Sequence, residues 1–369
     1  MKIILKLLIG ILNLIFAVFK LLPVKNKVTF ISRQSDTKTE DMELLEVELR
    51  KKAPDLKQVF LCKKLDGGIG RKISYCFHLI TQMYHIATSK VVILDSYSIA
   101  VSVLKQRPSL VVIQMWHALG SLKRFGLSIV GEGEGRKESV ASAMKMHQNY
   151  TYVLTSGKAC TPYFGEAFGS GEETVKVMSL PRVDKLTNKA FEEEMIRKIY
   201  GKYPQFKEKK VIVYAPTFRI DKDISAEAEA LASEFDSDKF AFVIKKHPLM
   251  AIDCKSAIVD EAFTTLEMFF VADYVICDYS AVIFEAAIMK KPLFFYAFDY
   301  ESYGVERDFY IDYKSEMPGL ISTATNEIAK AISADNYDLA KVEAFGSKYV
   351  ECQEGCSERL ADMIIGELN

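Results

Sequence analysis

Two histidines and a serine occupy positions where side chains could do chemistry, each next to an apolar run. His117 follows "VVIQMW", which holds the chain's only tryptophan, Trp116, and His247 lies in "FAFVIKKHP". Ser280 lies in "DYSAVIFEAAI". Histidine is the commonest general base because its reference pKa is near neutral. These residues predict proton transfer beside a bound anion; the plainer alternative is two structural histidines and a helix cap.

Four polar clusters fall at the carboxyl ends of apolar runs, where ligands bind in open α/β sheets. They are Trp116-His117, "APTFR" (215–219), "KKHP" (245–248) and "DYSAVIFEAAIMKKP" (278–292). Any one of them could be an ordinary structural loop. Because all four follow expected strands, we expect them to line a site.

The fourth cluster has the pattern of a strand, a serine and a helix. The first turn of a helix offers free N–H groups and the positive end of the helix dipole, which suits a phosphate. Glu285 lies about a turn and a half into that helix, where its carboxylate could accept hydrogen bonds from a ribose. The alternatives are that Ser280 only caps the helix and that Glu285 is solvated surface.

Short apolar runs alternate with amphipathic segments along most of the chain, which predicts parallel sheets covered by helices on both faces. The expected strands are 27–32, 58–62, 90–95, 110–116 and 152–156, then 210–216, 240–248, 274–278 and 292–298. Helices are expected between several of them, for example over 41–53 and 71–87. A charged stretch near 191–210 separates the two groups. The prediction is an α/β fold of two doubly wound Rossmann-like domains that face a cleft, 25–190 and 191–369, the second one including the terminal helices.

Composition excludes some classes of protein. The 48 Lys and Arg nearly balance the 49 Asp and Glu, which argues against a general nucleic-acid binder. Seven cysteines, an odd number without a CxxC pair, predict a reducing compartment and no disulfide framework. No motif predicts a metal site, although a pyrophosphate could recruit Mg²⁺.

The amino terminus, residues 1–24, is almost wholly apolar from Ile3 to Leu22. About 20 residues could just span a bilayer. However, Lys6 and Lys20 lie inside the stretch, which favours a helix lying on an anionic membrane surface.

Taken together, the motifs resemble the bacterial CDP-glycerol:poly(glycerol phosphate) glycerophosphotransferases of teichoic acid synthesis and their ribitol-phosphate relatives. The matching stretches are "WHALGSLKRFGLS", "HQNYTYVLTS", "LPRVDKL", "YAPTFR", "KKHP" and "DYSAVIFEAAIMKKPLFFYAFDYESYGVERDFYIDY", in family order over about 110–315. The resemblance implies a GT-B architecture at the cytoplasmic face of the membrane, peripherally attached. It also implies transfer of a polyol phosphate from a CDP-polyol to a lipid-linked polymer or disaccharide, with release of CMP. Glycerol and ribitol donors both fit these motifs, as do single addition and polymerisation.

The resemblance also assigns residues to roles. His117 and His247 fall on the family's two catalytic histidines, and either could be the base. Donor-binding positions would be Thr217, Arg219, Lys246, Pro248, Asp278, Tyr279, Ser280, Ala281 and Glu285. Acceptor-side positions would be Trp116, Gly120, Lys123, Ser156 and Arg182.

Two other functions remain open from the sequence. The first is a GT-B glycosyltransferase or epimerase that uses a UDP-sugar, which would release UDP rather than CMP. The second is a membrane-attached scaffold that binds nucleotide without turnover.

Overall fold

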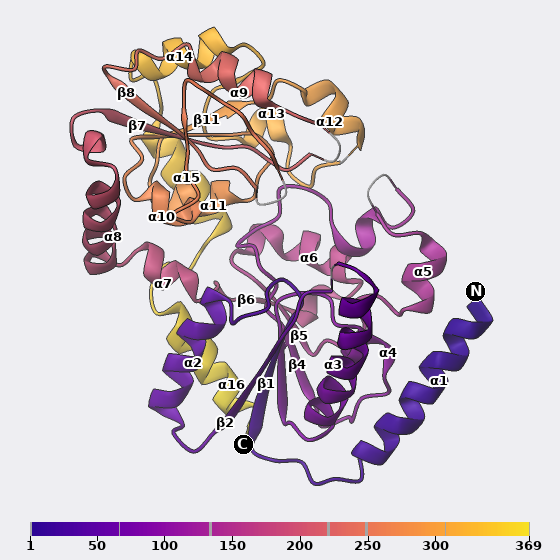
Figure 1. The fold of residues 1–369 in the computed structure, drawn as a ribbon. Helices are drawn as coiled ribbons and strands as arrows, with labels where there is room; N and C mark the ends of the chain where they lie inside the picture. Colours follow the sequence, from indigo (N-terminus) through magenta and orange to yellow (C-terminus); the bar gives the residue numbers. More distant parts are fainter. Residues whose placement is uncertain are drawn as a thin grey trace. The chain divides into compact units, whose positions relative to one another are not determined.

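The computed structural model describes residues 2–65, 67–132, 135–219, 222–247, 250–306 and 308–368, without the side chains of 2–4 and 304–306. The chain forms two compact units, and each is described by itself. Unit 1 comprises 1–118, 124–182 and 354–369; unit 2 comprises 119–123 and 183–353. Each unit holds one six-stranded parallel sheet (Figure 1).

The sheet of unit 1 has the strand order β2-β1-β3-β4-β5-β6. Its strands are β1 (Lys27–Ser32), β2 (Lys57–Cys62), β3 (Val91–Leu94), β4 (Val111–Gln114), β5 (Tyr152–Thr155) and β6 (Val175–Val177). Every residue of β1 and β3 is buried, as expected when helices cover both faces of a parallel sheet. The order reverses between β1 and β3, so the carboxyl ends of these strands form the crevice where such sheets bind ligands.

Helices flank the unit 1 sheet on both sides. Helices α2 and α16 pack together on one side, and α3 lies on the other with α1 and α4 (Figure 1). The helices of this unit are α1 (Lys2–Phe19), α2 (Glu40–Lys52), α3 (Ile69–Ala87), α4 (Ile99–Val103), α5 (Glu138–Ala143), α6 (Thr161–Phe168) and α16 (Cys356–Gly366), with 3-10 turns at Gly126–Ile129, Lys158–Cys160 and Glu172–Thr174. Helix α7 (Arg182–Leu186) begins at the last residue of this segment of unit 1.

The sheet of unit 2 has the order β12-β11-β10-β7-β8-β9. Counted from its own first strand, this is the 3-2-1-4-5-6 order of dinucleotide-binding folds, and it reverses between β7 and β10. The strands are β7 (Lys210–Ala215), β8 (Phe240–Ile244), β9 (Ile258–Val259), β10 (Tyr274–Cys277), β11 (Leu293–Tyr296) and β12 (Ile321–Ser322).

The helices of unit 2 also form two layers. Helices α9 and α14 lie on one side of the sheet, and α10, α11 and α15 lie on the other (Figure 1). The bounds are α8 (Lys189–Lys202), α9 (Ser225–Ala232), α10 (Thr265–Phe269), α11 (Val282–Ile288), α12 (Tyr300–Glu306), α13 (Tyr313–Glu316), α14 (Thr325–Ser333) and α15 (Leu339–Tyr349), with a 3-10 turn at Pro204–Lys207.

The amino-terminal helix α1 packs against unit 1. Phe16 is buried in the core formed by β1, β3, α3 and α4. Asn13 interrupts the apolar sequence because its side chain ties α1 to the loop after α4: Nδ2 donates to the Val103 carbonyl at 3.2 Å, and Oδ1 accepts from the Lys105 N–H at 2.8 Å. Among the described residues, no helix is both long enough and apolar enough to cross a bilayer.

The predicted α/β class with two parallel sheets is confirmed. The structure departs from the expected domains at two places. The terminal helix α16, expected in the second domain, packs on α2 in unit 1. The segment 119–123, expected in the first domain, packs with unit 2. All seven cysteines are free thiols.

Candidate active site

His117 lies at the carboxyl edge of the unit 1 sheet, three residues beyond β4. Its Nδ1 is 2.9 Å from the backbone carbonyl of Asp95, which follows the neighbouring strand β3. Because a carbonyl oxygen can only accept a hydrogen bond, Nδ1 carries the proton. The neutral ring therefore presents an unprotonated Nε2, which is the form a general base requires.

The surroundings of His117 keep the ring neutral. The side chain is exposed at this edge, yet desolvation by the protein atoms around it lowers the pKa of His117, and the Asp95 carbonyl only partly opposes this shift. The side-chain amide of Gln34, beyond β1, lies 3.4 Å from the same Nδ1. His117 thus follows β4 and contacts the residues after β1 and β3, next to the point where the strand order reverses.

Arg182 holds the backbone of the same loop. Its Nη2 donates to the His117 carbonyl at 3.3 Å. The guanidinium also pairs with Asp41, a buried residue at the start of α2, and Nε donates to Oδ2 of Asp41 at 2.9 Å. Arg182, predicted on the acceptor side, therefore lies beside His117, and its visible contacts position the loop.

Trp116 adopts a left-handed backbone conformation, with φ of 62°. Such a conformation is unusual for a bulky residue and costs of order 1–3 kcal/mol. The indole packs against Phe125, with ring centroids 5.0 Å apart, and lies 4.1 Å from the ring of His117. The left-handed conformation of Trp116 thus accompanies close packing of its indole ring on the imidazole of the next residue, His117.

A second histidine of unit 1, His147, is structural. It is buried against Phe168 and accepts or donates a 3.0 Å hydrogen bond with the Tyr150 hydroxyl. Desolvation lowers the pKa of His147 to about 3, so it stays neutral.

Ser156 directly follows β5, the neighbour of β4, and is buried. Its hydroxyl has no hydrogen-bond partner among the described residues, and the same holds for Thr155 beside it and for Ser179 beyond β6. A buried hydroxyl without a partner is costly, and Ser156 is the one of the three that directly follows a strand at the carboxyl edge of the sheet.

In unit 2, the residues after β7 and β10 meet across the strand-order reversal. The Thr217 N–H and hydroxyl both donate to Oδ1 of Asp278, at 2.9 and 2.5 Å. Arg219 Nη1 lies 2.9 Å from Oδ2 of Asp278, and its Nε and Nη2 donate to Asp299 at 2.7 and 2.9 Å. The two carboxylates and the guanidinium are buried.

Four of the predicted donor-binding residues belong to this buried network or contact it. Thr217, Arg219 and Asp278 hold one another, and the buried ring of Tyr279 stacks on Tyr303 while its hydroxyl donates to Asp299. These side chains support the loop from beneath. Asp299, which directly follows the expected strand 292–298, was not singled out in the sequence, although an acid after an apolar run was the available signal. Asp95 carried the same signal in unit 1.

Ser280 and Ala281 are the half-buried residues of this loop, just before α11. Their own N–H groups have no hydrogen-bond partner among the described residues, whereas the Tyr279 N–H donates to Asp278. The Ser280 hydroxyl accepts only a long bond, 3.4 Å, from the Val282 N–H. Donors that converge on a helix start without partners can hold an anion. Glu285, one turn further along, is buried rather than solvated.

The segment 119–123 contacts the same region of unit 2. A Cβ on Gly120 would lie 2.8 Å from the ring of Phe284 in α11, so only glycine allows this approach. Lys123 donates to the Tyr303 hydroxyl at 2.9 Å. Gly120 and Lys123, predicted on the acceptor side, thus pack in the unit that holds the predicted donor residues.

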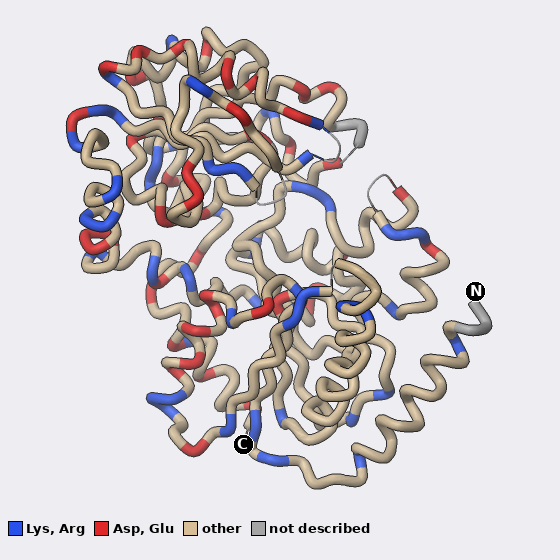
Figure 2. Tube along the Cα trace, viewed as in Figure 1, with Lys and Arg blue, Asp and Glu red and all other residues tan. Residues whose placement is uncertain are grey.

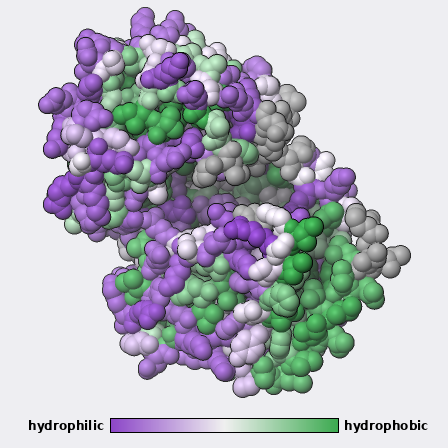
Figure 3. Space-filling model, viewed as in Figure 1, coloured by the Kyte–Doolittle hydropathy of each residue, from purple (hydrophilic) through white to green (hydrophobic). Residues whose placement is uncertain are grey.

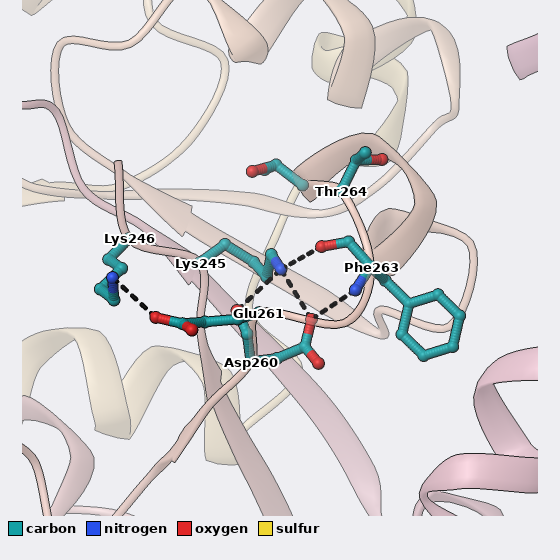
Figure 4. Close-up of a pocket in the computed structure, with 7 residues that line it drawn as sticks. Lys245, Lys246, Asp260, Glu261, Phe263 and Thr264 are labelled. Carbon is teal, nitrogen blue, oxygen red and sulfur yellow. Dashed lines mark hydrogen bonds and ion pairs between the residues drawn. The ribbon is translucent and has the colours of Figure 1, made fainter. Parts of the chain in front are cut away.

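The "KKHP" cluster divides into different roles. Lys245 is buried and pairs with Asp260 at 2.6 Å, and Lys246 pairs with Glu261 at 2.8 Å. Both lysines line a cavity of about 510 Å³ at the carboxyl ends of β8 and β9, together with the 260–265 loop (Figure 4). His247 is exposed, with its ring 5.0 Å from that of Phe218, and partial burial lowers its pKa. Pro248 lies outside the described residues.

Metal ligands are not gathered at this site. Among the described residues, no three His, Cys, Asp or Glu side chains form a group that could hold an ion. The carboxylates nearest the Ser280 loop, Asp278 and Asp299, are already paired with Arg219. These carboxylates are therefore engaged with a cation of the protein itself.

Two doubly wound units with polar residues at their carboxyl edges define the class of two-domain, nucleotide-using α/β enzymes. The model of the CDP-glycerol:poly(glycerophosphate) glycerophosphotransferase family matches residues 14–366, and the chain belongs to this family. The resemblance drawn from the motifs is therefore confirmed.

Relatives of known function agree with this assignment. The chain is 33% identical to the teichoic acid ribitol-phosphate primase of Bacillus spizizenii, over 93% of this chain and 92% of the relative. It is 31% identical to the teichoic acid poly(ribitol-phosphate) polymerase of the same species, over 98% of this chain but 60% of the relative. It is 29% identical to the teichoic acid glycerol-phosphate primase of Bacillus subtilis, over 76% and 74%.

Solved structures share the fold. A structure of the wall teichoic acid polymerase TagF superposes with a TM-score of 0.77 at 21% identity, covering 97% of this chain and 94% of that one. A UDP-GlcNAc 2-epimerase from Neisseria meningitidis gives a TM-score of 0.57 at 11% identity, covering 92% and 99%. The fold alone is thus common to the polyol-phosphate polymerase and to the UDP-sugar enzyme, and the family match favours the first of these two functions.

Proposed function

We propose that this enzyme transfers a polyol phosphate from a CDP-polyol to a hydroxyl of a lipid-linked teichoic acid acceptor and releases CMP. The observation that carries the proposal is the family match over nearly the whole chain, which includes both units and their carboxyl edges. Two features of the described geometry support the proposal: the neutral imidazole of His117 in unit 1 and the N–H groups of Ser280 and Ala281 in unit 2. We further propose that the two edges face one cleft during the reaction.

His117 is the general base in this proposal. The acceptor hydroxyl attacks the β-phosphate of the donor, and its proton passes to Nε2 of His117 as the new P–O bond forms and the bond to CMP breaks. The Nδ1–H bond to the Asp95 carbonyl fixes the ring and stabilises the imidazolium that results. The buried Ser156 hydroxyl, beside β4, donates to or accepts from the acceptor.

The Ser280 loop binds the donor's phosphates. The unpartnered N–H groups of Ser280 and Ala281 meet the pyrophosphate, and negative charge that develops on the departing CMP is stabilised by donors already in place. His247 donates a hydrogen bond to the same group from the loop after β8, two strands away from β10 in the sheet, and Glu285 holds the ribose. The underlying Asp278–Arg219–Asp299 network keeps the loop rigid.

The cavity beside Lys246 receives the cytidine end of the donor. Its volume of about 510 Å³ lies in the range of small-molecule sites, and it opens at the same edge of the unit 2 sheet as the Ser280 loop. Lys246→Ala should weaken CDP binding in calorimetry, whereas Lys255→Ala, beyond the cavity lining, should leave it unchanged. Equal affinities for both variants would place the nucleotide elsewhere.

Ribitol phosphate is the unit we propose to be transferred, because the match to the ribitol-phosphate primase covers over nine-tenths of both chains and that to the glycerol-phosphate primase about three-quarters. The deciding experiment offers CDP-ribitol, CDP-glycerol and a UDP-sugar with a lipid-linked acceptor and analyses products by mass spectrometry. Transfer with CMP release is expected from CDP-ribitol. Transfer from CDP-glycerol alone would reassign the polyol, and release of UDP would favour the sugar-nucleotide alternative.

Peripheral attachment at the cytoplasmic membrane face completes the proposal. Helix α1 buries one side against unit 1 and exposes the other, including Leu7, Leu14 and Val18 at 60–70% exposure. Lys6 and Lys20 lie on the same helix or at its end, where they would meet anionic lipid headgroups.

A further inference from the structure

The first two turns of α3 expose an apolar stripe that the fold leaves uncovered. Ile69, Ile73 and Phe77 recur every four residues and therefore lie on one side of the helix. Their exposed fractions are 78%, 55% and 73%, so more than half of each of these large apolar residues lies in solvent. Leu65, just before the helix, is also exposed.

The stripe belongs to the same side of unit 1 as α1. Helix α1 packs on the later turns of α3, where Phe19 lies edge-on to Tyr84 at 6.0 Å and Leu79 and Ile80 join the same apolar cluster. The early turns of α3 extend beyond this contact. Figure 3 shows the apolar surface over α1 continuing to α3.

Charge on both helices has one sign. No Asp or Glu occurs in residues 1–35 or in residues 67–94, in a chain whose net charge is −1. Arg71 and Lys72 are exposed between Ile69 and Ile73, and Nη2 of Arg71 lies 3.8 Å from Oδ2 of Asp36. Figure 2 shows basic but no acidic residues along α1. An exposed apolar stripe bordered by Arg71 and Lys72, on a helix that itself carries no acid, suits an anionic lipid surface.

We propose that the stripe Ile69, Ile73 and Phe77 is a second membrane-inserting element, which enters an anionic bilayer beside α1. The inference rests on the peripheral attachment proposed above. It extends that attachment to α3, a helix that the sequence analysis did not identify as membrane-binding. Because α3 follows β2, it begins at the carboxyl edge of the unit 1 sheet, the edge where His117 lies. A bilayer that holds this stripe would therefore bring its lipid-linked acceptor to that edge.

The test measures sedimentation of the full-length protein with vesicles, without donor or acceptor. The variant Ile69→Gln, Ile73→Gln, Phe77→Gln should bind phosphatidylglycerol-containing vesicles at least tenfold more weakly than the native protein. The control Val47→Gln, on α2 and also half-exposed, should bind like the native protein. None of these three proteins should bind phosphatidylcholine vesicles strongly. A thermal melt checks that the triple variant stays folded.

Cys76 gives a second readout in the otherwise native sequence. It is exposed between Ile73 and Phe77, so an environment-sensitive fluorophore on it should shift to the blue on anionic vesicles. The same label should not respond in a Cys76→Ser protein.

Each outcome decides the proposal. If the triple variant binds vesicles normally, or the label on Cys76 stays in water, α3 does not insert. If the native protein is dimeric and only the triple variant is monomeric, with vesicle binding unchanged, the stripe is an interface between copies and the proposal is wrong. If Leu7→Gln, Leu14→Gln, Val18→Gln removes binding while the α3 variant does not, attachment through α1 stands alone. If neither variant loses binding, the protein attaches through another surface and the proposal is wrong. If the native protein itself does not bind anionic vesicles, attachment is rejected, whatever the transfer activity.

Discussion

At the scale of single residues, the site depends on the proton arrangement of one imidazole. The Asp95 carbonyl fixes the Nδ1–H of His117, and desolvation lowers the pKa of the ring. Because the base acts only when neutral, activity should persist through neutral pH and fall as the pH drops through the lowered pKa, on the acid side of 6.5.

His117→Asn should therefore reduce turnover by roughly 10²–10⁴, the usual cost of losing a general base, while CDP binding is kept. The residual activity should no longer fall at acidic pH (the acidic limb of the pH profile), because the titrating group is gone. The measurement is CMP release as a function of pH for both proteins. An unchanged acidic limb in the variant would assign that limb to another group, and near-native turnover would reject His117 as the base.

The Ser280 loop offers a second test at this scale. Ser280→Ala removes a hydroxyl that makes only one long contact within the protein. If it bonds a phosphate, the loss should weaken CDP binding by about 1–3 kcal/mol. Calorimetry against Ser237→Ala, an exposed turn residue of the same unit, provides the comparison. Equal affinities would leave Ser280 as part of a helix start only.

At the scale of elements, a buried ion network joins the ends of β7, β10 and β11. Burial alone would raise the pKa of Asp299, but the hydrogen bonds and charge of Arg219 lower it below the ordinary value. A depressed carboxyl pKa adds stability that is fully present above the unfolded pKa of about 3.9 and is lost as the pH falls through the folded value.

Asp299→Asn should cost about 1.5–3 kcal/mol of unfolding free energy at neutral pH, because it weakens two charge-assisted hydrogen bonds of Arg219 and leaves Asp278 as its one buried carboxylate partner. The variant should also lose part of the stability decline that the native protein shows below pH 4. Urea unfolding at several pH values measures both effects. Asp238→Asn, an exposed change in the same unit, should alter neither; a similar cost in that control would mean that burial of the network does not matter.

Helix α1 has two different sides: one packs in the unit 1 core and the other is exposed. Asn13→Ala removes hydrogen bonds to Val103 and Lys105 and should destabilise the protein by about 1–2 kcal/mol. Leu14→Ala, one residue on and 70% exposed, should change stability by less than about 0.5 kcal/mol. Thermal unfolding compares the two. A stable Asn13→Ala protein would show that α1 is only loosely docked.

At the scale of the whole molecule, the sequence predicted elements well and their partners poorly. The nine expected strands exist, because each is a long apolar run. The strands β6, β9 and β12 were missed because they have only two or three residues. Likewise, Asp278 and Arg219 could be located in motifs but not paired, since their contact depends on β7 lying next to β10. The return of α16 to unit 1 leaves no local pattern at all.

Long-range packing also decides which variant can test how the enzyme meets its acceptor, because helix α1 is both part of the unit 1 core and the proposed membrane contact. Deleting 2–22 would remove Phe16 from the unit 1 core, so it would confuse folding with membrane delivery. Leu7→Gln, Leu14→Gln, Val18→Gln changes only the exposed side of α1. Confinement to the membrane raises the effective concentration of a lipid-linked acceptor. The triple variant should therefore slow transfer to that acceptor at least tenfold, while transfer to a soluble analogue stays near the native rate. Equal slowing of both reactions would make the exposed side structural, and no slowing of either would remove α1 from acceptor delivery.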